Sequence, residues 1–335
     1  MLFLFFAVLS VIIINMELIE GRTRPKVIYN NDQGYKPYGG CDGDNPQGMV
    51  HFLFYANEID IQLIIASGST NCAGAGDNIN EANHIIDLYE QDYDILNSKL
   101  PNYPTADHLR SITYQGCNHS APSVGYPPES IEASKKIIEI VDSLDSDEIV
   151  WYGAGAGLCE LARALHDKPS IADKIGVYSI GSWNTEQDPY SRKYIYDNYP
   201  QLFWIESNGT FGGWFSGGNQ SGIYNDQTYD KQIIGSSSSK LAQYYSTIIP
   251  SQFKSPAFQE GDGPAYFYVI DPDHANRNMM DPTQPNWGGQ YSQFGGNSRP
   301  KFYTDDWSKY GGNSIQQWRV NYLDDWKFRL DNWFD

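Results

Sequence analysis

The chain has 335 residues, of which 40% are hydrophobic and 19% are charged, so it holds enough apolar material for a core and wholesale disorder is excluded. Its 23 Lys and Arg against 41 Asp and Glu give a formal net charge of −18, which opposes nucleic acid and acidic membranes as partners and leaves neutral solutes and cations. Aromatic residues reach 15%, which is typical either of a Tyr-rich core or of rings that stack on sugars and bases.

The first residues predict a leader that directs export. The run from Leu2 to Ile14 is almost wholly apolar and has the length of the hydrophobic region of a signal peptide. It is shorter than the roughly 20 residues that span a bilayer comfortably, so we expect no stable membrane span. We therefore predict a signal peptide at 1–21, a domain at 22–335 and a secreted, extracellular or periplasmic protein, with an uncleaved anchor as the alternative.

Two further features fit an exported chain. Four cysteines allow one or two disulfides, and their spacing matches no zinc pattern. Three Asn-x-Ser/Thr sequons would accept glycans in a eukaryotic source. The cysteines are Cys41, Cys72, Cys117 and Cys159, and the sequons begin at Asn118, Asn208 and Asn219.

Apolar runs alternate with amphipathic segments from Lys26 onward. Strands are predicted at 26–29, 59–67, 148–152, 175–180 and 201–206. Helices are predicted at 47–57, 80–96, 130–144, 158–166, 189–198 and 240–249, with Ser130 as an N-cap. This alternation predicts one α/β domain, a doubly wound and mostly parallel sheet with helices on both faces.

The second half of the chain is less regular. Residues 209–225 and 287–296 are rich in Gly, Asn, Trp and Ser and are predicted as long surface loops. The apolar run 265–270 is predicted as a strand that follows a glycine turn. The amphipathic tail, 315–334, is predicted to pack onto the core, with an exposed sugar-stacking face as the alternative.

Ligands of doubly wound sheets bind beyond the carboxyl ends of the strands, so the polar residues at those ends are candidate site residues. Carboxylates and amides gathered there suit a hard cation such as Ca²⁺, although the same residues also serve as turn formers and helix caps. The group after the first strand comprises Asn30, Asn31, Asp32, Asp42, Asp44 and Asn45.

Three later strand ends carry comparable features. The small residues 153–157 let the backbone approach a ligand, a metal or the next helix, but they match neither a dinucleotide fingerprint nor a nucleophile elbow. Residues 182–184 and Asp188 follow the strand at 175–180. Residues 260–262 place a carboxylate beside a glycine turn.

Taken together, these residues resemble the nucleoside hydrolase superfamily, and they are most similar to the nucleoside hydrolase-like domain of cellulose-binding proteins. The resemblance runs from about Arg24 to the C-terminus. It rests on the segments 27–32 (VIYNND), 44–45 (DN), 49–58 (MVHFLFYANE), 183–184 (WN), 188–189 (DP), 199–205 (YPQLFWI), 260–264 (EGDGP) and 318–319 (WR).

The resemblance implies a calcium-centred site that cleaves an N-glycosidic bond. It places Asp32 where the family binds the metal and activates water. Asp44 and Asn45 fall on further metal positions, Gly155 falls where a backbone carbonyl binds the metal, and Asp262 matches a ligand from late in the chain. We therefore expect Ca²⁺ as the cofactor, with sugar hydroxyls chelated to it and carboxylates stabilising an oxocarbenium-like transition state.

The resemblance also implies a small ligand, either a nucleoside or a glycan. Asp44 falls on a ribose-binding position, Asn184 falls on a sugar-hydroxyl contact, and Trp183 is placed to stack on a base or a second sugar. Three positions depart from the family pattern: Asn45 is neutral where an acid is expected, Gly261 replaces a His, and Ser182 replaces an acid.

The sequence leaves three functions open: a secreted Ca²⁺-dependent hydrolase of nucleoside-like bonds, a non-catalytic binder of cellulose or another glucan on the same scaffold, and a protein whose site has decayed. Retention of Asp32, Asp44 and Asp262 favours the first. The Trp-rich loops and the neutral Asn45 favour the second.

Overall fold

The computed structural model describes residues 24–33, 43–68, 78–181, 183–214, 216–250, 253–270, 278–305 and 311–334. The predicted signal peptide, Asp42, Cys41, Cys72 and Ser182 lie outside these residues. Among the described residues, none of the helices combines the length and the apolar character needed to cross a bilayer.

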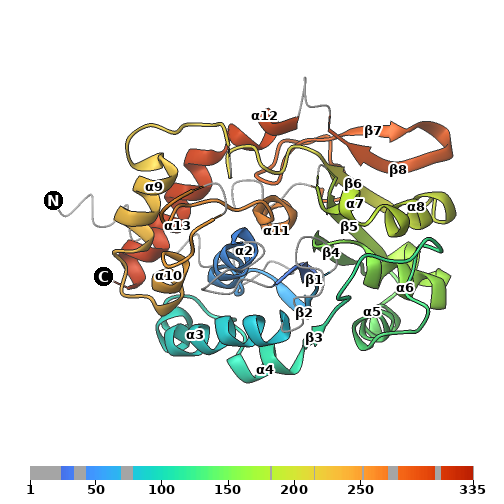
Figure 1. The fold of residues 1–335 in the computed structure, drawn as a ribbon, viewed down its shortest axis with the longest axis horizontal. Helices are drawn as coiled ribbons and strands as arrows, with labels where there is room; N and C mark the ends of the chain where they lie inside the picture. The colour runs from blue at the N-terminus through green and yellow to red at the C-terminus, as the bar shows by residue number, and fades with distance from the viewer. Residues whose placement is uncertain are drawn as a thin grey trace.

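The described strands form one eight-stranded sheet in the order β3-β2-β1-β4-β5-β6-β8-β7 (Figure 1). All neighbouring strands run parallel except the antiparallel pair β7–β8 at one edge. The strands are β1 (Lys26–Asn31), β2 (Asp60–Ala66), β3 (Thr113–Gln115), β4 (Val150–Gly155), β5 (Ile175–Ile180), β6 (Phe203–Ser207), β7 (Ser292–Gly295) and β8 (Arg299–Thr304). The predicted mostly parallel sheet is confirmed.

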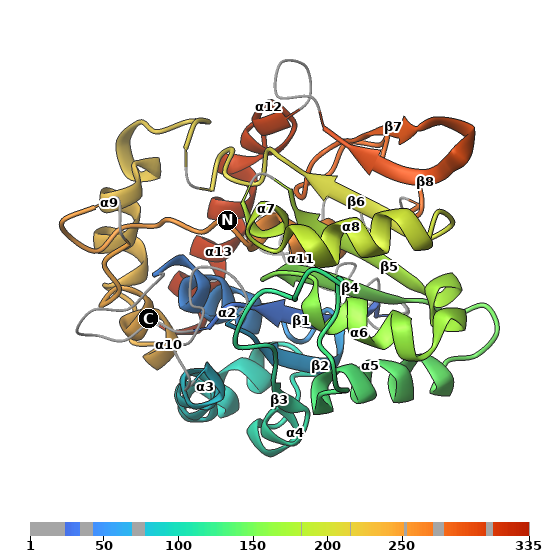
Figure 2. The same ribbon diagram turned by 45° about the vertical axis from the view of Figure 1, so that its right-hand side comes forward.

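Helices cover both faces of the sheet (Figure 2). Because successive strand residues point to opposite faces, Tyr29 packs into a core with α2, α3, α11 and α13, whereas its neighbour Ile28 packs into a second core with α5, α6 and α8. The α-helices are α2 (Asp44–Phe54), α3 (Asn78–Lys99), α4 (Ala106–Ser111), α5 (Glu132–Ser143), α6 (Cys159–Asp167), α7 (Asn184–Gln187), α8 (Pro189–Asn198), α9 (Asp226–Tyr229), α10 (Lys240–Tyr245), α11 (Gly263–Ile270), α12 (Gly311–Gln316) and α13 (Arg319–Trp333). The doubly wound α/β fold is thereby confirmed.

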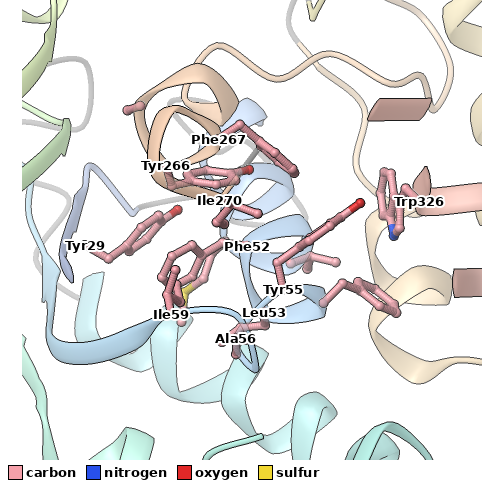
Figure 3. Packing of buried hydrophobic residues seen from close by; sticks show 14 of the residues in the cluster. Tyr29, Phe52, Leu53, Tyr55, Ala56, Ile59, Tyr266, Phe267, Ile270 and Trp326 are labelled. Carbon is pink, nitrogen blue, oxygen red and sulfur yellow. The ribbon is translucent and has the colours of Figure 1, made fainter. Parts of the chain in front are cut away.

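Aromatic packing fixes α2 and α11 on the first face. Tyr29 of β1 stacks on Phe52 of α2 with ring centroids 4.4 Å apart, and Tyr266 of α11 meets Phe52 edge-on at 5.2 Å (Figure 3). Trp326 of α13 closes the same core by stacking on His51 at 3.8 Å. The predicted packing of the C-terminal tail onto the core is therefore confirmed.

Several local predictions are wrong. Residues 265–270 belong to helix α11 and not to a strand, because every side chain of α11 is buried and no polar face reveals its period. Helix α5 has Ile131 as its N-cap, and the Ser130 hydroxyl instead bonds Asp167 at 2.5 Å. The loops predicted on the surface hold two fully buried tryptophans, Trp214 and Trp287.

One disulfide joins Cys117, just after β3, to Cys159 at the start of α6. Cys159 is thus both buried and paired. The bond ties two chain segments at the carboxyl edge of the sheet.

Candidate functional site

The carboxyl ends of β1 and β4 lie side by side, with Asn31 paired to Gly155 in the parallel register. The chain leaves β1 toward β2 and β3 on one side and returns to β4 on the other, so the switch point of the sheet lies between β1 and β4 (Figure 1). Helix α2 begins at Asp44 and α11 at Gly263, both close to this edge. The topology therefore places the candidate residues at the position where such folds bind ligands.

Asn31 links the two most distant parts of the site. Its Nδ2 donates to Asp262 Oδ2 at 2.5 Å, to the Tyr29 hydroxyl oxygen at 2.6 Å and, more weakly, to the Asn45 carbonyl at 3.4 Å. Asn31 and Asp262 are separated by 231 residues in the sequence, and both are buried. The sequence predicted Asn31 only as one of the polar residues that follow the strand at 26–29 and gave it no separate role, whereas in the structure it is the last residue of β1.

The first predicted acid, Asp32, is also buried, and its backbone carbonyl accepts a hydrogen bond from Asn45 Nδ2 at 2.9 Å. Asp44 is half-buried, and its Oδ2 accepts from the Gly261 N–H at 3.1 Å. Asp32 and Asn45 are thus linked directly, whereas Asp44 reaches the residue before Asp262. Asp44 is the first residue of α2, whose N-cap is Gly43, so neither Asp44 nor Asn45 caps the helix.

Gly155 lies against the Asp262 carboxylate. A Cβ at Gly155 would stand 2.8 Å from Asp262 Cγ and 2.9 Å from Oδ2, so no larger residue fits without movement. The Gly155 carbonyl accepts from Asn184 Nδ2 at 2.5 Å, which brings Asn184 to the same edge. Trp183, the preceding residue, is the N-cap of α7 and is 43% exposed.

Asp188, the other acid after β5, has a different environment. Its carboxylate accepts from the backbone N–H groups of Ala121 at 3.0 Å and Leu158 at 3.1 Å. Burial raises the pKa of Asp188 even though these bonds lower it. Asp188 therefore joins loops beside the site.

Negative charge accumulates around Tyr29. Burial is the main reason that the pKa of Tyr29 is raised well above its usual value, and the negative charges of Asp262, Glu260 and Asp32 raise it further. All three carboxylates are buried. Buried carboxylates are stable only when they are paired, hydrogen-bonded or bound to a cation.

The atoms at this edge that could bind a metal are oxygens. Within the described ranges, no group of three or more His, Cys, Asp and Glu side chains has an arrangement that could hold a metal ion. Two further buried amide oxygens, Asn31 Oδ1 and Gln33 Oε1, have no hydrogen-bond partner in the described part of the chain. Carboxylate, amide and carbonyl oxygens are the donors that a hard cation such as Ca²⁺ takes.

Comparison with known proteins relates the chain to one family. Residues 39–291 match the family model of the nucleoside hydrolase-like domain of the cellulose-binding protein Sde182. The fold is similar to that of a nucleoside hydrolase-related hypothetical protein from Saccharophagus degradans that is associated with carbohydrate metabolism. The TM-score is 0.73, with 22% identity over 93% of this chain and 72% of that chain.

The fold is also similar to that of an inosine-guanosine nucleoside hydrolase, with a TM-score of 0.54 and 13% identity over 92% of this chain and 99% of that chain. At these identities the two structures show the fold alone. No curated protein sequence matches the chain.

Proposed function

Since the chain belongs to the family of nucleoside hydrolase-like domains of Sde182-type cellulose-binding proteins, we propose that it hydrolyses an N-glycosidic bond of a nucleoside-like ligand at the carboxyl edge of β1 and β4, with Ca²⁺ as its cofactor. The observation that carries this proposal is the buried contact of Asn31 with Asp262 at 2.5 Å, beside Asp32 and Asn45. This contact joins the end of β1, which Asp32 follows, to Asp262, 231 residues further along the chain.

The proposed cation ligands are Asp32, Asp44, Asn45, Asp262 and the Gly155 carbonyl. Their all-oxygen chemistry fits Ca²⁺, and the neutral Asn45 lowers the negative charge of the set and hence its affinity. A bound Ca²⁺ would supply positive charge that fixes two neighbouring sugar hydroxyls and makes a nearby water more acidic.

The proposed hydrolysis uses the side chains as follows. Asp32 takes a proton from the attacking water, whose oxygen bonds to the anomeric carbon while the bond to the leaving nitrogen breaks. The leaving base takes its proton from solvent, because Gly261 has no side chain to donate one and a Cβ there would lie 2.8 Å from Asp44 Oδ2. Asn184 orients a sugar hydroxyl, and Asp262 stabilises the positive charge that develops on the ring.

A second function, glycan binding without hydrolysis, is favoured by one surface. Trp183, Tyr190 and Val124 are 43%, 48% and 52% exposed. The loop that carries Val124 is tied to the segment between the two aromatics, since Ser120 Oγ donates to the Gln187 carbonyl at 2.8 Å. Exposed aromatic rings next to a polar edge suit stacking on sugar rings.

We further propose that residues 1–21 are a signal peptide, that 22–335 form the mature domain and that the protein acts outside the cytoplasm. The apolar run from Leu2 to Ile14 supports this proposal. The Cys117–Cys159 disulfide supports it as well, because such bonds persist in oxidising compartments.

The test is release of free sugar from a panel of purine and pyrimidine ribonucleosides, with Ca²⁺ or with a chelator. We expect Asp32→Asn to lower kcat about 100-fold or more, as removal of a general base does, and the chelator to abolish turnover. Asp230→Asn, which changes a buried carboxylate on another element, is the control and should retain activity.

Turnover that survives Asp32→Asn would refute the proposed mechanism. If the wild-type protein cleaves none of the nucleosides but binds soluble glucans in the presence of chelator, and Trp183→Ala weakens this binding, the second function replaces the first.

A further inference from the structure

One side of α2 holds the chain segment that leads into Asp262. Gln47 Nε2 donates to the Ala257 carbonyl at 2.8 Å, and Gln47 Oε1 accepts from the Gln259 N–H at 3.1 Å. A single buried amide therefore pairs with two backbone groups of the segment 257–262. This pair of hydrogen bonds fixes both the position and the direction of the segment.

One turn further along α2, His51 contacts the next residue of the segment. His51 Nδ1 lies 2.9 Å from Glu260 Oε1, and both side chains are buried. Tyr245 and Tyr266 each donate a hydroxyl to the same carboxylate at 3.1 Å. Three donors satisfy Glu260, so it anchors the segment within the core, and the stacking of His51 on Trp326 at 3.8 Å holds the imidazole in place.

These contacts form one row. Asp44, Gln47 and His51 are spaced i, i+3 and i+7, so they lie on one face of α2. Asp44 bonds Gly261, Gln47 bonds Ala257 and Gln259, and His51 contacts Glu260, so all three hold the segment that ends at Gly261. Asp262 follows Gly261 directly and receives the bond from Asn31 of the strand edge.

We propose that Gln47 and His51 are positioning residues that hold the 257–262 segment against α2 and thereby place the Asp262 carboxylate at the strand edge. As a role in calcium binding, this inference rests on the proposed function. It predicts that weakening the row displaces Asp262 even though neither Gln47 nor His51 belongs to the proposed ligand set. Mutation of residues that orient metal ligands without binding the metal typically changes metal affinity about 10–100-fold.

The test compares Gln47→Leu and Glu260→Ala with the conservative Glu260→Gln, which keeps a hydrogen-bonding side chain for His51 and the two tyrosines. Ser239→Ala is the matched control. Its hydroxyl is buried and caps α10 by accepting from the Ala242 N–H, and its loss destabilises the fold away from the segment. Each folded variant is measured by amide hydrogen exchange without metal and by calorimetric titration with Ca²⁺.

We expect Gln47→Leu and Glu260→Ala to lose exchange protection at Gln259 and Gly261 and to bind Ca²⁺ about tenfold more weakly or worse. Glu260→Gln should retain most of both properties, and Ser239→Ala should lower the melting temperature without changing either.

Unchanged protection at Gln259 and Gly261 in Gln47→Leu would overturn the positioning role, whatever the calcium result. Lost protection with unchanged calcium affinity would overturn the link to Asp262. A wild-type protein that gives no heat with Ca²⁺ would refute the metal in the proposed function, and hydrogen exchange would still decide whether the row positions the segment.

Discussion

Replacing Gly155 with alanine tests how closely β4 approaches the Asp262 carboxylate. The added Cβ would lie 2.8 Å from Asp262 Cγ and 2.9 Å from Oδ2, both closer than real Cβ atoms approach, and 3.0 Å from Oδ1. Asp262 must therefore move, and movement strains its 2.5 Å hydrogen bond with Asn31. Overpacking costs about 1–3 kcal/mol, and a hydrogen bond to a charged group contributes about 1.5–3 kcal/mol, so we expect a loss of about 3 kcal/mol in the free energy of unfolding.

Gly153, two residues earlier on β4, is the matched control. A Cβ at Gly153 meets its nearest atoms at 3.8–3.9 Å, which is ordinary van der Waals contact. Alanine within a strand also lowers the entropy of the unfolded chain relative to glycine. We therefore expect Gly153→Ala to change the free energy of unfolding by less than about 1 kcal/mol.

Both variants are compared with the wild type by urea denaturation and by calcium titration. Gly155→Ala should be the less stable of the two and should lose calcium affinity, whereas Gly153→Ala should match the wild type in both. Equal stability and equal calcium binding in the two variants would refute the close packing of Gly155 against Asp262.

Three other predictions concern stability. Burial raises the pKa of Asp230 to about 6, so the native state favours the protonated acid and stability is lost as the pH rises from about 4 through 6. Asp230→Asn should remove this pH dependence and raise the free energy of unfolding at pH 7.5 by up to about 3 kcal/mol. Thermal unfolding curves of the variant that keep the wild-type pH dependence would contradict this expectation. Replacing Cys117 and Cys159 with alanine should lower the free energy of unfolding, measured by urea denaturation, by about 4 kcal/mol, because the disulfide joins residues separated by 42 positions. An unchanged midpoint of the urea transition would count against the disulfide. Arg319→Ala should cost about 3–5 kcal/mol in the same assay, because it leaves the buried Asp226 without its 2.8 Å partner, and adding Asp226→Asn should recover part of the loss; full additivity of the two changes would argue against the pair.

The central strands could be predicted from the sequence because parallel strands buried on both faces are short, continuous apolar runs. The run 175–180 is such a case, and it was predicted with the bounds that the structure shows for β5. The alternation of these runs with amphipathic helices such as 189–198 was enough to predict the doubly wound fold.

Elements without a periodic pattern could not be predicted in this way. Helix α11 is buried on every side, so its sequence, 263–270, has no polar face to distinguish it from a strand. Strand β3 has three residues, too few to show alternation, and it exists because β2 offers it a parallel edge. Trp214 lies in a glycine-rich stretch that reads as a surface loop, yet it stacks on Tyr322 at 3.9 Å inside the core.

The candidate site could likewise be predicted in part from the sequence. Strand ends could be predicted to carry ligand-binding residues, because topology alone places those ends together. The partner of each residue depends on tertiary packing between distant segments, so the bond of Asn31 to Asp262 and the row from Gln47 to His51 are visible only in the structure. The 43% exposure of Trp183 likewise depends on the folded structure and is not visible in the sequence.

The proposed calcium site is tested most directly by a crystal structure of the protein grown with calcium, with anomalous differences collected at long wavelength. We expect one strong anomalous peak at the carboxyl edge of β1 and β4, with oxygens of Asp32 and Asp262 about 2.3–2.6 Å away. A fully ordered site without a peak, with Asn31 still bonded to Asp262 at saturating calcium, would contradict it.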